Sequence, residues 1–218
     1  MSDDIPEKGA IVQRDKETYA IAPHIPGGIM DVNTLRKIAD VAEKYNATAV
    51  KITSAQRIAL VGLRAEDLDS IWSDLGMAPG AAIGLCVRSV KICPGTTFCK
   101  RGQQDSVGVG LKLDGLYHGM ELPSKLKMGV SGCQNTCAES SVKDIGLIGT
   151  TKGWKLMAGG SSGIKPRIAD IIAEGLDDAG ALELVERIIE FMKARGEKQR
   201  LGRVIDDMGL EAFKSAVL

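Results

Sequence analysis

Apolar and polar positions in the first part of the chain predict a strand, a helix, two strands and a second helix. A short strand is expected over residues 19–23, and two strands around a turn over residues 48–53 and 57–61. Asp31 suits the start of the first helix, and Gly76 suits the end of the second. The helical stripes consist of Val32, Leu35, Ile38, Ala39, Ala42 and Tyr45, and of Leu68, Ile71, Trp72 and Leu75. This order is typical of a ferredoxin-like α+β sandwich, with the helices on one face of an antiparallel sheet.

The remaining sequence predicts a second α+β domain. Strands are expected over residues 126–131, 145–148 and 154–157, and a weaker helical pattern covers residues 106–120. A clear apolar stripe follows between Asp177 and Gly196, formed by Ala181, Leu184, Val185, Ile188 and Met192. The expected organisation is therefore a flexible polar leader over residues 1–17, a ferredoxin-like domain over 18–78, and a second domain over 79–218.

Composition narrows the class of protein. The chain has 218 residues, of which 44% are hydrophobic, and it contains no apolar run long enough to span a bilayer, so no membrane insertion is expected. The 28 basic and 28 acidic residues cancel, and aromatic residues make up only 4%. These values argue against nucleic acid as a partner. The sequence begins without an apolar signal core and its five cysteines are an odd number, which favours the cytoplasm over a secreted, disulfide-bonded protein.

Four of the five cysteines form two pairs, Cys93 with Cys99 and Cys133 with Cys137, with five and three residues between partners. Four thiolates brought together can hold an iron–sulfur cluster or a zinc ion. The wider gap fits a structural zinc site poorly, and scattered core cysteines are a third possibility. Spacing alone favours the cluster without excluding the other two. Cys86 lies in an apolar run and is expected to be a buried thiol.

The residues around these pairs resemble the nitrite and sulfite reductase family, which couples siroheme to a [4Fe-4S] cluster. The resemblance rests on the segment Cys93-Pro-Gly-Thr-Thr-Phe-Cys99-Lys-Arg-Gly, on Leu122-Pro-Ser-Lys-Leu-Lys127, and on Gly132-Cys-Gln-Asn-Thr-Cys137. It extends from about Ile21 to near the C-terminus, and within the family the chain looks like the small assimilatory type. Larger members contain two copies of this arrangement, so the resemblance implies one half of a two-fold architecture and leaves a homodimer possible.

The resemblance implies a role for each site residue. Cys93, Cys99, Cys133 and Cys137 would bind the [4Fe-4S] cluster, and the Cys137 sulfur would also bridge to the siroheme iron. Arg57, Arg88, Lys125 and Lys127 would bind the anionic substrate and donate protons, although spacing alone would make each an ordinary surface cation. Gly159 and Gly160, in the segment Ala158-Gly-Gly-Ser-Ser-Gly163, would contact the cofactor through the backbone.

The implied activity is the six-electron reduction of sulfite to sulfide. Reduction of nitrite to ammonia with the same cofactors is the nearest alternative, and a non-enzymatic siroheme and iron–sulfur electron carrier is another. Neither a Gly-x-x-x-x-Gly-Lys nor a Gly-x-Gly-x-x-Gly segment is present, so no nicotinamide or flavin site is visible. Electrons are therefore expected from an external protein donor.

Overall fold

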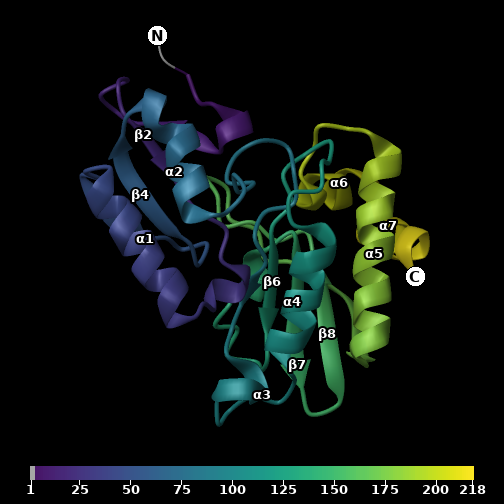
Figure 1. The fold of residues 1–218 in the computed structure, drawn as a ribbon. Helices are drawn as coiled ribbons and strands as arrows, with labels where there is room; N and C mark the ends of the chain where they lie inside the picture. The colour runs from purple at the N-terminus through teal and green to yellow at the C-terminus, as the bar shows by residue number, and fades with distance from the viewer. Residues whose placement is uncertain (1–2) are drawn as a thin grey trace. The chain divides into compact units, whose positions relative to one another are not determined.

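The computed structural model describes residues 3–218, which divide between Gly84 and Leu85 into two compact units. In the first unit four strands form an antiparallel sheet in the order β1-β2-β4-β3. The strands are β1 (Ala10–Val12), β2 (Tyr19–Ile21), β3 (Ala49–Ile52) and β4 (Ile58–Leu63). Helices α1 (Val32–Lys44) and α2 (Leu68–Leu75) pack on it, and short 3-10 turns occupy Pro6–Lys8, Pro26–Gly28 and Ala65–Asp67 (Figure 1). The unit is the ferredoxin-like sandwich that the sequence predicts.

The ends of both helices in this unit follow from local chemistry. The Asp31 carboxylate accepts a hydrogen bond from the backbone N–H of Thr34 at 2.7 Å and so caps α1. Gly76 ends α2 in the left-handed region, with φ of 63°. The predicted buried face of α1 is partly wrong, because Val32 and Leu35 are 60% and 49% exposed. The core instead buries the second half of this helix, through Ile38, Val41 and Ala42.

The expected leader over residues 1–17 contains regular structure. Strand β1 lies within it and pairs with β2, Ala10 opposite Ile21. Ala10 is fully buried, and the Trp72 indole N–H donates to the backbone carbonyl of Lys8 at 2.9 Å. Residues 3–17 are therefore part of the sandwich, and residues 1–2 of the expected leader lie outside the described part of the chain.

The second unit is built on a five-stranded sheet in the order β5-β6-β7-β8-β9. Its strands are β5 (Lys91–Ile92), β6 (Met128–Ser131), β7 (Ile145–Thr150), β8 (Gly153–Ala158) and β9 (Asp170–Leu176). Strands β5, β6 and β7 run parallel, whereas β8 and β9 are antiparallel to their neighbours. The unit is thus a mixed α+β fold.

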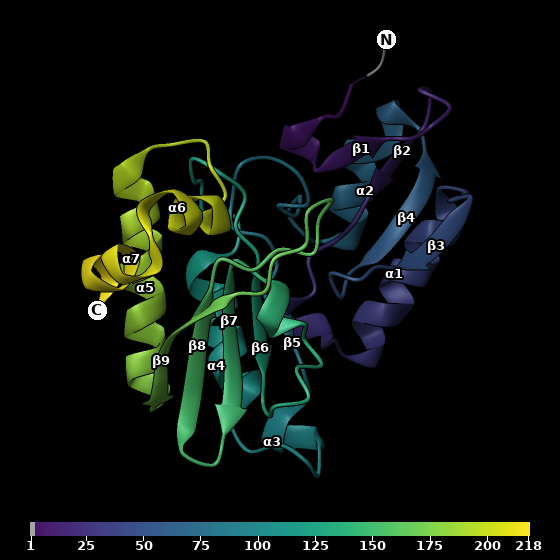
Figure 2. The same ribbon diagram turned by 180° about the vertical axis from the view of Figure 1, so that it is seen from behind.

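Helices α4 (Ser106–Tyr117) and α5 (Asp178–Arg195) cover one face of this sheet (Figures 1 and 2). Helices α6 (Leu201–Met208) and α7 (Leu210–Val217) pack on each other, and α7 also packs on α5, while the one-turn helix α3 (Gly95–Phe98) lies in the loop after β5. Their apolar side chains and those of the strands form one core around Trp154 and Phe213, both fully buried. The 3-10 turn Ser140–Val142 packs on the opposite face, against β6 and β7.

Within residues 3–218, none of the helices has the combination of length and apolar character that a bilayer crossing requires.

Candidate functional site

Both cysteine pairs follow neighbouring parallel strands. Cys93 comes directly after β5, and Cys133 comes two residues after the end of β6. Ile92 is paired with Val130 in this ladder. Because the carboxyl ends of parallel strands meet at one edge of a sheet, the two cysteine loops begin side by side.

Hydrogen bonds join these two loops directly. The Gly132 N–H donates to the Cys93 sulfur, with 3.0 Å between N and Sγ. The Gly132 carbonyl in turn accepts from the backbone N–H groups of Gln103 and Gln104, at 2.8 and 3.0 Å. The residue immediately before Cys133 is therefore fixed against both ends of the segment that carries Cys93 and Cys99.

Glycines make this close approach possible. A Cβ atom on Gly132 would lie 2.7 Å from the Gly95 Cα, and one on Gly102 would lie 2.5 Å from the Gly95 carbonyl carbon. Gly95 itself has φ of 51°, in the left-handed region. A side chain at these positions would push the cysteine loops apart.

The four thiols differ in exposure. Cys93 is buried, Cys99 and Cys133 are half-buried, and Cys137 is exposed. Among residues 3–218, no three His, Cys, Asp or Glu side chains are grouped as ligands of a single metal ion. A four-iron cluster requires a wider arrangement than a single ion, since each cysteine binds a different iron.

Glu139 fixes the segment that follows Cys137. Its carboxylate accepts from the Lys91 and Lys143 ammonium groups, with N–O distances of 2.7 and 2.9 Å. Both lysine side chains are largely buried, and their hydrogen bonds lower the pKa of Glu139 to about 2. The Ala138 N–H also donates to the Ser131 hydroxyl at 3.1 Å. The chain therefore folds back over β6 directly after Cys137.

We expect Glu139→Gln to loosen this segment. The neutral amide would lose the charge-assisted bonds to two largely buried ammonium groups, so a cluster held by Cys137 should release iron to a chelator about 10-fold faster. Glu183→Gln is the matched control, because Glu183 forms an exposed ion pair with Arg187 on α5. Equal iron-release rates in the two variants would contradict this role of Glu139.

Three of the four predicted cations lie beside the cysteine-bearing strands. Val87 and Leu126 form a parallel bridge just before β5 and β6, and both side chains are buried. The Arg88 N–H donates to the Leu126 carbonyl at 2.9 Å, and Lys125 and Lys127, both exposed, flank Leu126. Alternation along the chain therefore places Arg88, Lys125 and Lys127 on the face opposite the core.

Asp144 and Arg200 hold Lys127 in place, and sequence reasoning missed both. The Asp144 carboxylate, 1% exposed, accepts from the Lys127 N–H at 2.7 Å and from the Arg200 guanidinium at 2.9 and 2.7 Å. Burial raises the pKa of the Asp144 carboxyl, and Arg200 opposes that rise. Burial, followed by nearby Arg200, Lys143 and Lys125, lowers the pKa of Lys127. The only feature of the sequence that could have indicated this pair is the acidic residue Asp144 directly before the buried strand β7.

Arg200→Met should lower the free energy of unfolding by about 3 kcal/mol, because it leaves a buried carboxylate without its cation. Arg203→Met, on the same helix, removes only an exposed ion pair with Asp207 and should cost about 0.5 kcal/mol or less. Urea unfolding of both variants measures the difference. Similar losses would show that the Asp144–Arg200 pair contributes no more than an ordinary surface pair.

Gly159 and Gly160 contact the protein itself. Gly159 has φ of 85°, its N–H donates to the Asp144 carbonyl at 2.7 Å, and its carbonyl accepts from Arg167 at 3.1 Å. A Cβ atom on Gly160 would lie 2.6 Å from the Lys143 carbonyl oxygen. The Gly159 amide is therefore engaged within the protein rather than directed at a ligand, and contact of these glycines with a cofactor stays a prediction.

Arg57 belongs to the first unit and is almost fully buried, at 3% exposure. Its guanidinium donates to the backbone carbonyls of Ala22 and Ala81, at 3.0 and 3.4 Å. These bonds orient the side chain inside its own unit. Its predicted role in binding the substrate anion stays a prediction.

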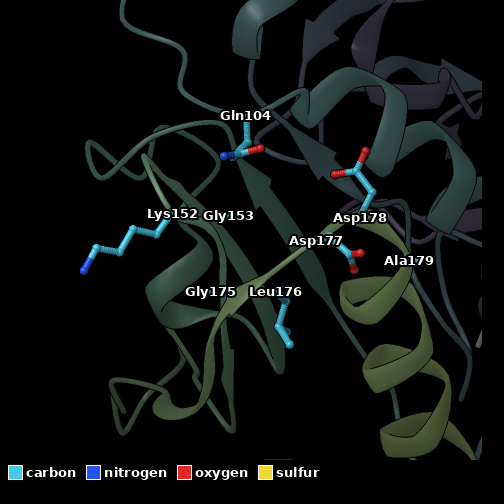
Figure 3. Close-up of a pocket in the computed structure, with 8 residues that line it drawn as sticks. All are labelled: Gln104, Lys152, Gly153, Gly175, Leu176, Asp177, Asp178 and Ala179. Carbon is cyan, nitrogen blue, oxygen red and sulfur yellow. The ribbon is translucent and has the colours of Figure 1, made fainter.

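An open pocket lies elsewhere in the second unit, at the corner between β9 and α5 (Figure 3). It is lined by Gln104, Lys152, Gly153, Gly175, Leu176, Asp177, Asp178 and Ala179. Asp177 caps α5 through the Gly180 N–H, and Asp178 accepts from the Trp154 indole. None of the predicted site residues lines this pocket.

Comparison with protein families identifies both units. Residues 83–218 match the nitrite and sulphite reductase 4Fe-4S domain, and residues 11–78 match the ferredoxin-like half domain of the same enzymes. The chain belongs to the nitrite and sulfite reductase family. It is accordingly an oxidoreductase, and membership implies siroheme and a [4Fe-4S] cluster as its cofactors.

Individual relatives agree with this family. The assimilatory-type sulfite reductase of Nitratidesulfovibrio vulgaris strain Hildenborough is 44% identical over 219 residues, covering all of both chains. The nitrite reductase [NAD(P)H] of Bacillus subtilis strain 168 is 37% identical over 95% of this chain, but only 26% of that protein is covered. Among solved structures, the NirA protein of Mycobacterium tuberculosis has a TM-score of 0.80 at 21% identity, covering 92% of this chain and 39% of that one. At this low identity, the similarity to NirA shows a shared fold alone.

The residues of this reductase fit the two cofactors. The backbone N–H that points at the Cys93 sulfur supplies the kind of hydrogen bond that a metal-bound thiolate accepts. The close glycine contacts keep the two cysteine loops side by side. Arg88, Lys125 and Lys127 supply cations beside the same strands, as a tetrapyrrole with many carboxylates and an anionic substrate both require.

Proposed function

We propose that this chain reduces sulfite to sulfide. The full-length similarity to a protein named assimilatory-type sulfite reductase supports this substrate. The observation that carries the proposal is the path of the chain after Cys137. It returns over β6, so that a Cβ atom on Gly129 would lie 2.8 Å from the Ala138 carbonyl and 3.0 Å from the Lys143 side chain. Gly129 and Lys127 are two residues apart and lie on one face, which supports a location of Cys137 on the same side of the strand as Lys127.

In the proposed site Cys93, Cys99, Cys133 and Cys137 would hold the cluster, and Cys137 would also serve as a ligand of the siroheme. When bound, the two cofactors would supply the electrons and the metal centre at which sulfite is reduced. The balanced reaction takes one sulfite dianion, six electrons and seven protons to one hydrosulfide ion and three water molecules. The protein must therefore deliver protons as well as neutralise an anion.

The cations perform both tasks. Arg88, Lys125 and Lys127 donate hydrogen bonds to the sulfite oxygens, which neutralises their charge and polarises the S–O bonds. The lowered pKa of Lys127 makes its ammonium group a readier acid than an ordinary lysine. Its Nζ proton passes to a departing oxygen, which leaves as water once a second proton has arrived. Arg57 completes the proposed anion-binding set, as the family resemblance implies.

Nitrite is the second candidate substrate, and the relatives named nitrite reductases favour it. Sulfite and nitrite are both small oxyanions, and reduction of either to sulfide or ammonia requires six electrons. Turnover of sulfite and nitrite by the holoenzyme with reduced methyl viologen tests the choice. We expect the higher kcat/KM for sulfite, and a higher value for nitrite would reverse the assignment. A protein that binds both cofactors but turns over neither anion would instead be an electron carrier.

The remaining parts of the proposal concern the cell. The lack of a nicotinamide- or flavin-binding motif in the sequence supports an external protein donor. The lack of a disulfide among the described cysteines supports a cytoplasmic location. The match of residues 11–78 to a half domain supports a second copy as a partner. Sedimentation of the holoenzyme tests this last point, with a dimer expected and a monomer contradicting it.

A further inference from the structure

The loop that carries Cys99 is tightly wound on itself. The Thr96 N–H donates to the Gln104 carbonyl at 3.3 Å, and the Gly102 N–H donates to the Cys99 carbonyl at 2.9 Å. A Cβ atom on Gly102 would lie 2.5 Å from the Thr96 N, and one on Gly95 would lie 2.7 Å from the Ser106 N, so neither glycine tolerates a side chain without a shift of the backbone. The backbone of the loop is therefore fixed, and the side chains that point outward from it have defined positions.

Those outward-facing residues form an unusual surface. Phe98, directly before Cys99, is 71% exposed, although phenylalanine is usually buried. Lys100 and Arg101, directly after Cys99, are exposed as well. An exposed aromatic ring beside an arginine is the composition that protein interfaces favour.

A third cation extends this surface. The Gln104 side-chain amide donates to the Thr150 carbonyl at 2.8 Å, which ties the Cys99 loop to the turn between β7 and β8. Lys152 lies in that turn and its side chain extends away from the protein (Figure 3). The turn and α3 lie at the same end of the second unit in both views (Figures 1 and 2). We call Phe98, Lys100, Arg101 and Lys152 the Cys99 surface.

Acidic residues at this end have internal partners. The Asp105 carboxylate caps α4 through the Gly108 N–H at 3.0 Å and accepts from the Thr97 hydroxyl at 3.2 Å. Asp177 and Asp178 are engaged with Gly180 and Trp154, as described above. The Cys99 surface itself consists of one aromatic ring and three cations, whereas these carboxylates are directed at donors of the protein.

We propose that the Cys99 surface is the docking site for an acidic one-electron carrier protein. This inference rests on the proposed function, which requires electrons from outside the chain. Cys99, a proposed cluster ligand, lies between Phe98 and Lys100. A partner bound at these residues would therefore be separated from the cluster by little more than the Cys99 side chain. This short separation matters because electron transfer slows steeply with distance. Charge complementarity selects an acidic partner and raises the rate of encounter.

Each docking event transfers one electron. The reduced carrier is oxidised by one electron, the cluster is reduced by one electron, and six such events supply one sulfite. Interfaces of this kind are small and transient, because the oxidised carrier must leave before the next arrives. One aromatic anchor surrounded by cations suits such an interface.

Binding to an acidic ferredoxin tests the proposal without relying on turnover. The probe is an oxidised, purified 2[4Fe-4S] ferredoxin titrated into the holoenzyme at low ionic strength. Phe98→Ala should raise the Kd about 10-fold, and the double variant Lys100→Glu/Arg101→Glu should raise it at least 100-fold. Added salt should weaken binding of the unaltered protein but not of the double variant. The matched controls are Leu116→Ala, an exposed apolar residue on α4, and Lys198→Glu, beyond the far end of α5.

Turnover with reduced methyl viologen separates this inference from the proposed function. Because this small donor needs no docking surface, Phe98→Ala should retain its viologen-dependent sulfite reduction within about two-fold while its KM for reduced ferredoxin rises. Absence of viologen-dependent turnover in the unaltered protein would refute the proposed function and leave the binding experiment to decide the docking site. Equal ferredoxin Kd values for the unaltered protein, the double variant and the controls would overturn the docking site.

Discussion

Cys137→Ser should abolish sulfite reduction and remove both cofactor signatures from the purified protein. By the proposed arrangement this thiolate binds one iron of the cluster and the siroheme iron, so its loss disrupts two centres. The position is also the most exposed of the four thiols, and serine is a poor replacement because its hydroxyl stays protonated at neutral pH. Iron and acid-labile sulfide should both fall, and the visible haem bands should shift or vanish. Activity should drop to the background of the assay.

Cys86→Ala is the matched control for this prediction. Cys86 is 6% exposed and lies outside the two cysteine pairs, in a bridge with Glu121. Its replacement should leave the iron content and the spectrum unchanged. The only expected effect is a lower free energy of unfolding, because the variant leaves a small cavity in the core. A normal haem spectrum and full iron content in Cys137→Ser would refute the bridging role.

Lys127→Met should lower kcat/KM for sulfite by about 10²–10³. The variant removes a positive charge and a proton donor while keeping most of the length of the side chain. The Lys127 backbone N–H, which donates to Asp144, is unaffected, so the fold should persist. Lys112→Met, an exposed lysine on α4, provides the control and should retain normal kcat/KM.

The pH dependence of the same parameter distinguishes Lys127 from a residue with a purely structural role. Lysine is charged below its pKa, and the pKa of Lys127 lies below the ordinary value of 10.5. We therefore expect kcat/KM to fall on the alkaline side at a lower pH than an ordinary lysine would give. Lys127→Arg should restore part of the activity and move this fall to higher pH, because arginine keeps its proton. An unchanged pH profile in Lys127→Arg would contradict the assignment.

Local patterns predicted much of the fold. Helix α5 was predicted with both ends, and the Asp177 carboxylate indeed accepts from the Gly180 N–H while Gly196 adopts the left-handed conformation. Strands β1 and β9 and helices α6 and α7 were not predicted. β1 is three residues long in a polar segment, and β9 carries exposed Ile171 beside buried Ile172 without regular alternation. Both strands are fixed by pairing with the preceding or following strand rather than by a pattern in their own sequence.

The residues of the candidate site likewise fall into those that the sequence could indicate and those that it could not. The cysteine pairs could be proposed as cluster ligands because ligand spacing and neighbouring residues are local features of the chain. Glu139, Asp144 and Arg200 were not found, since each acts through partners far along the chain, such as Arg200 with Asp144, 56 positions away. The anion-binding role of Arg57 stays a prediction, and no pattern in the sequence indicated the bonds from its guanidinium to backbone carbonyls of its own unit. Long-range contacts of this kind leave no periodic signal in a single sequence.

The most direct test of the central claim is the Mössbauer spectrum of the iron-enriched holoprotein. If the Cys137 thiolate joins the two centres, the siroheme iron and the cluster irons should be magnetically coupled, and sulfite should perturb the siroheme component. Independent spectra from an isolated haem and an isolated cluster, or a protein that contains zinc instead of iron, would contradict the account.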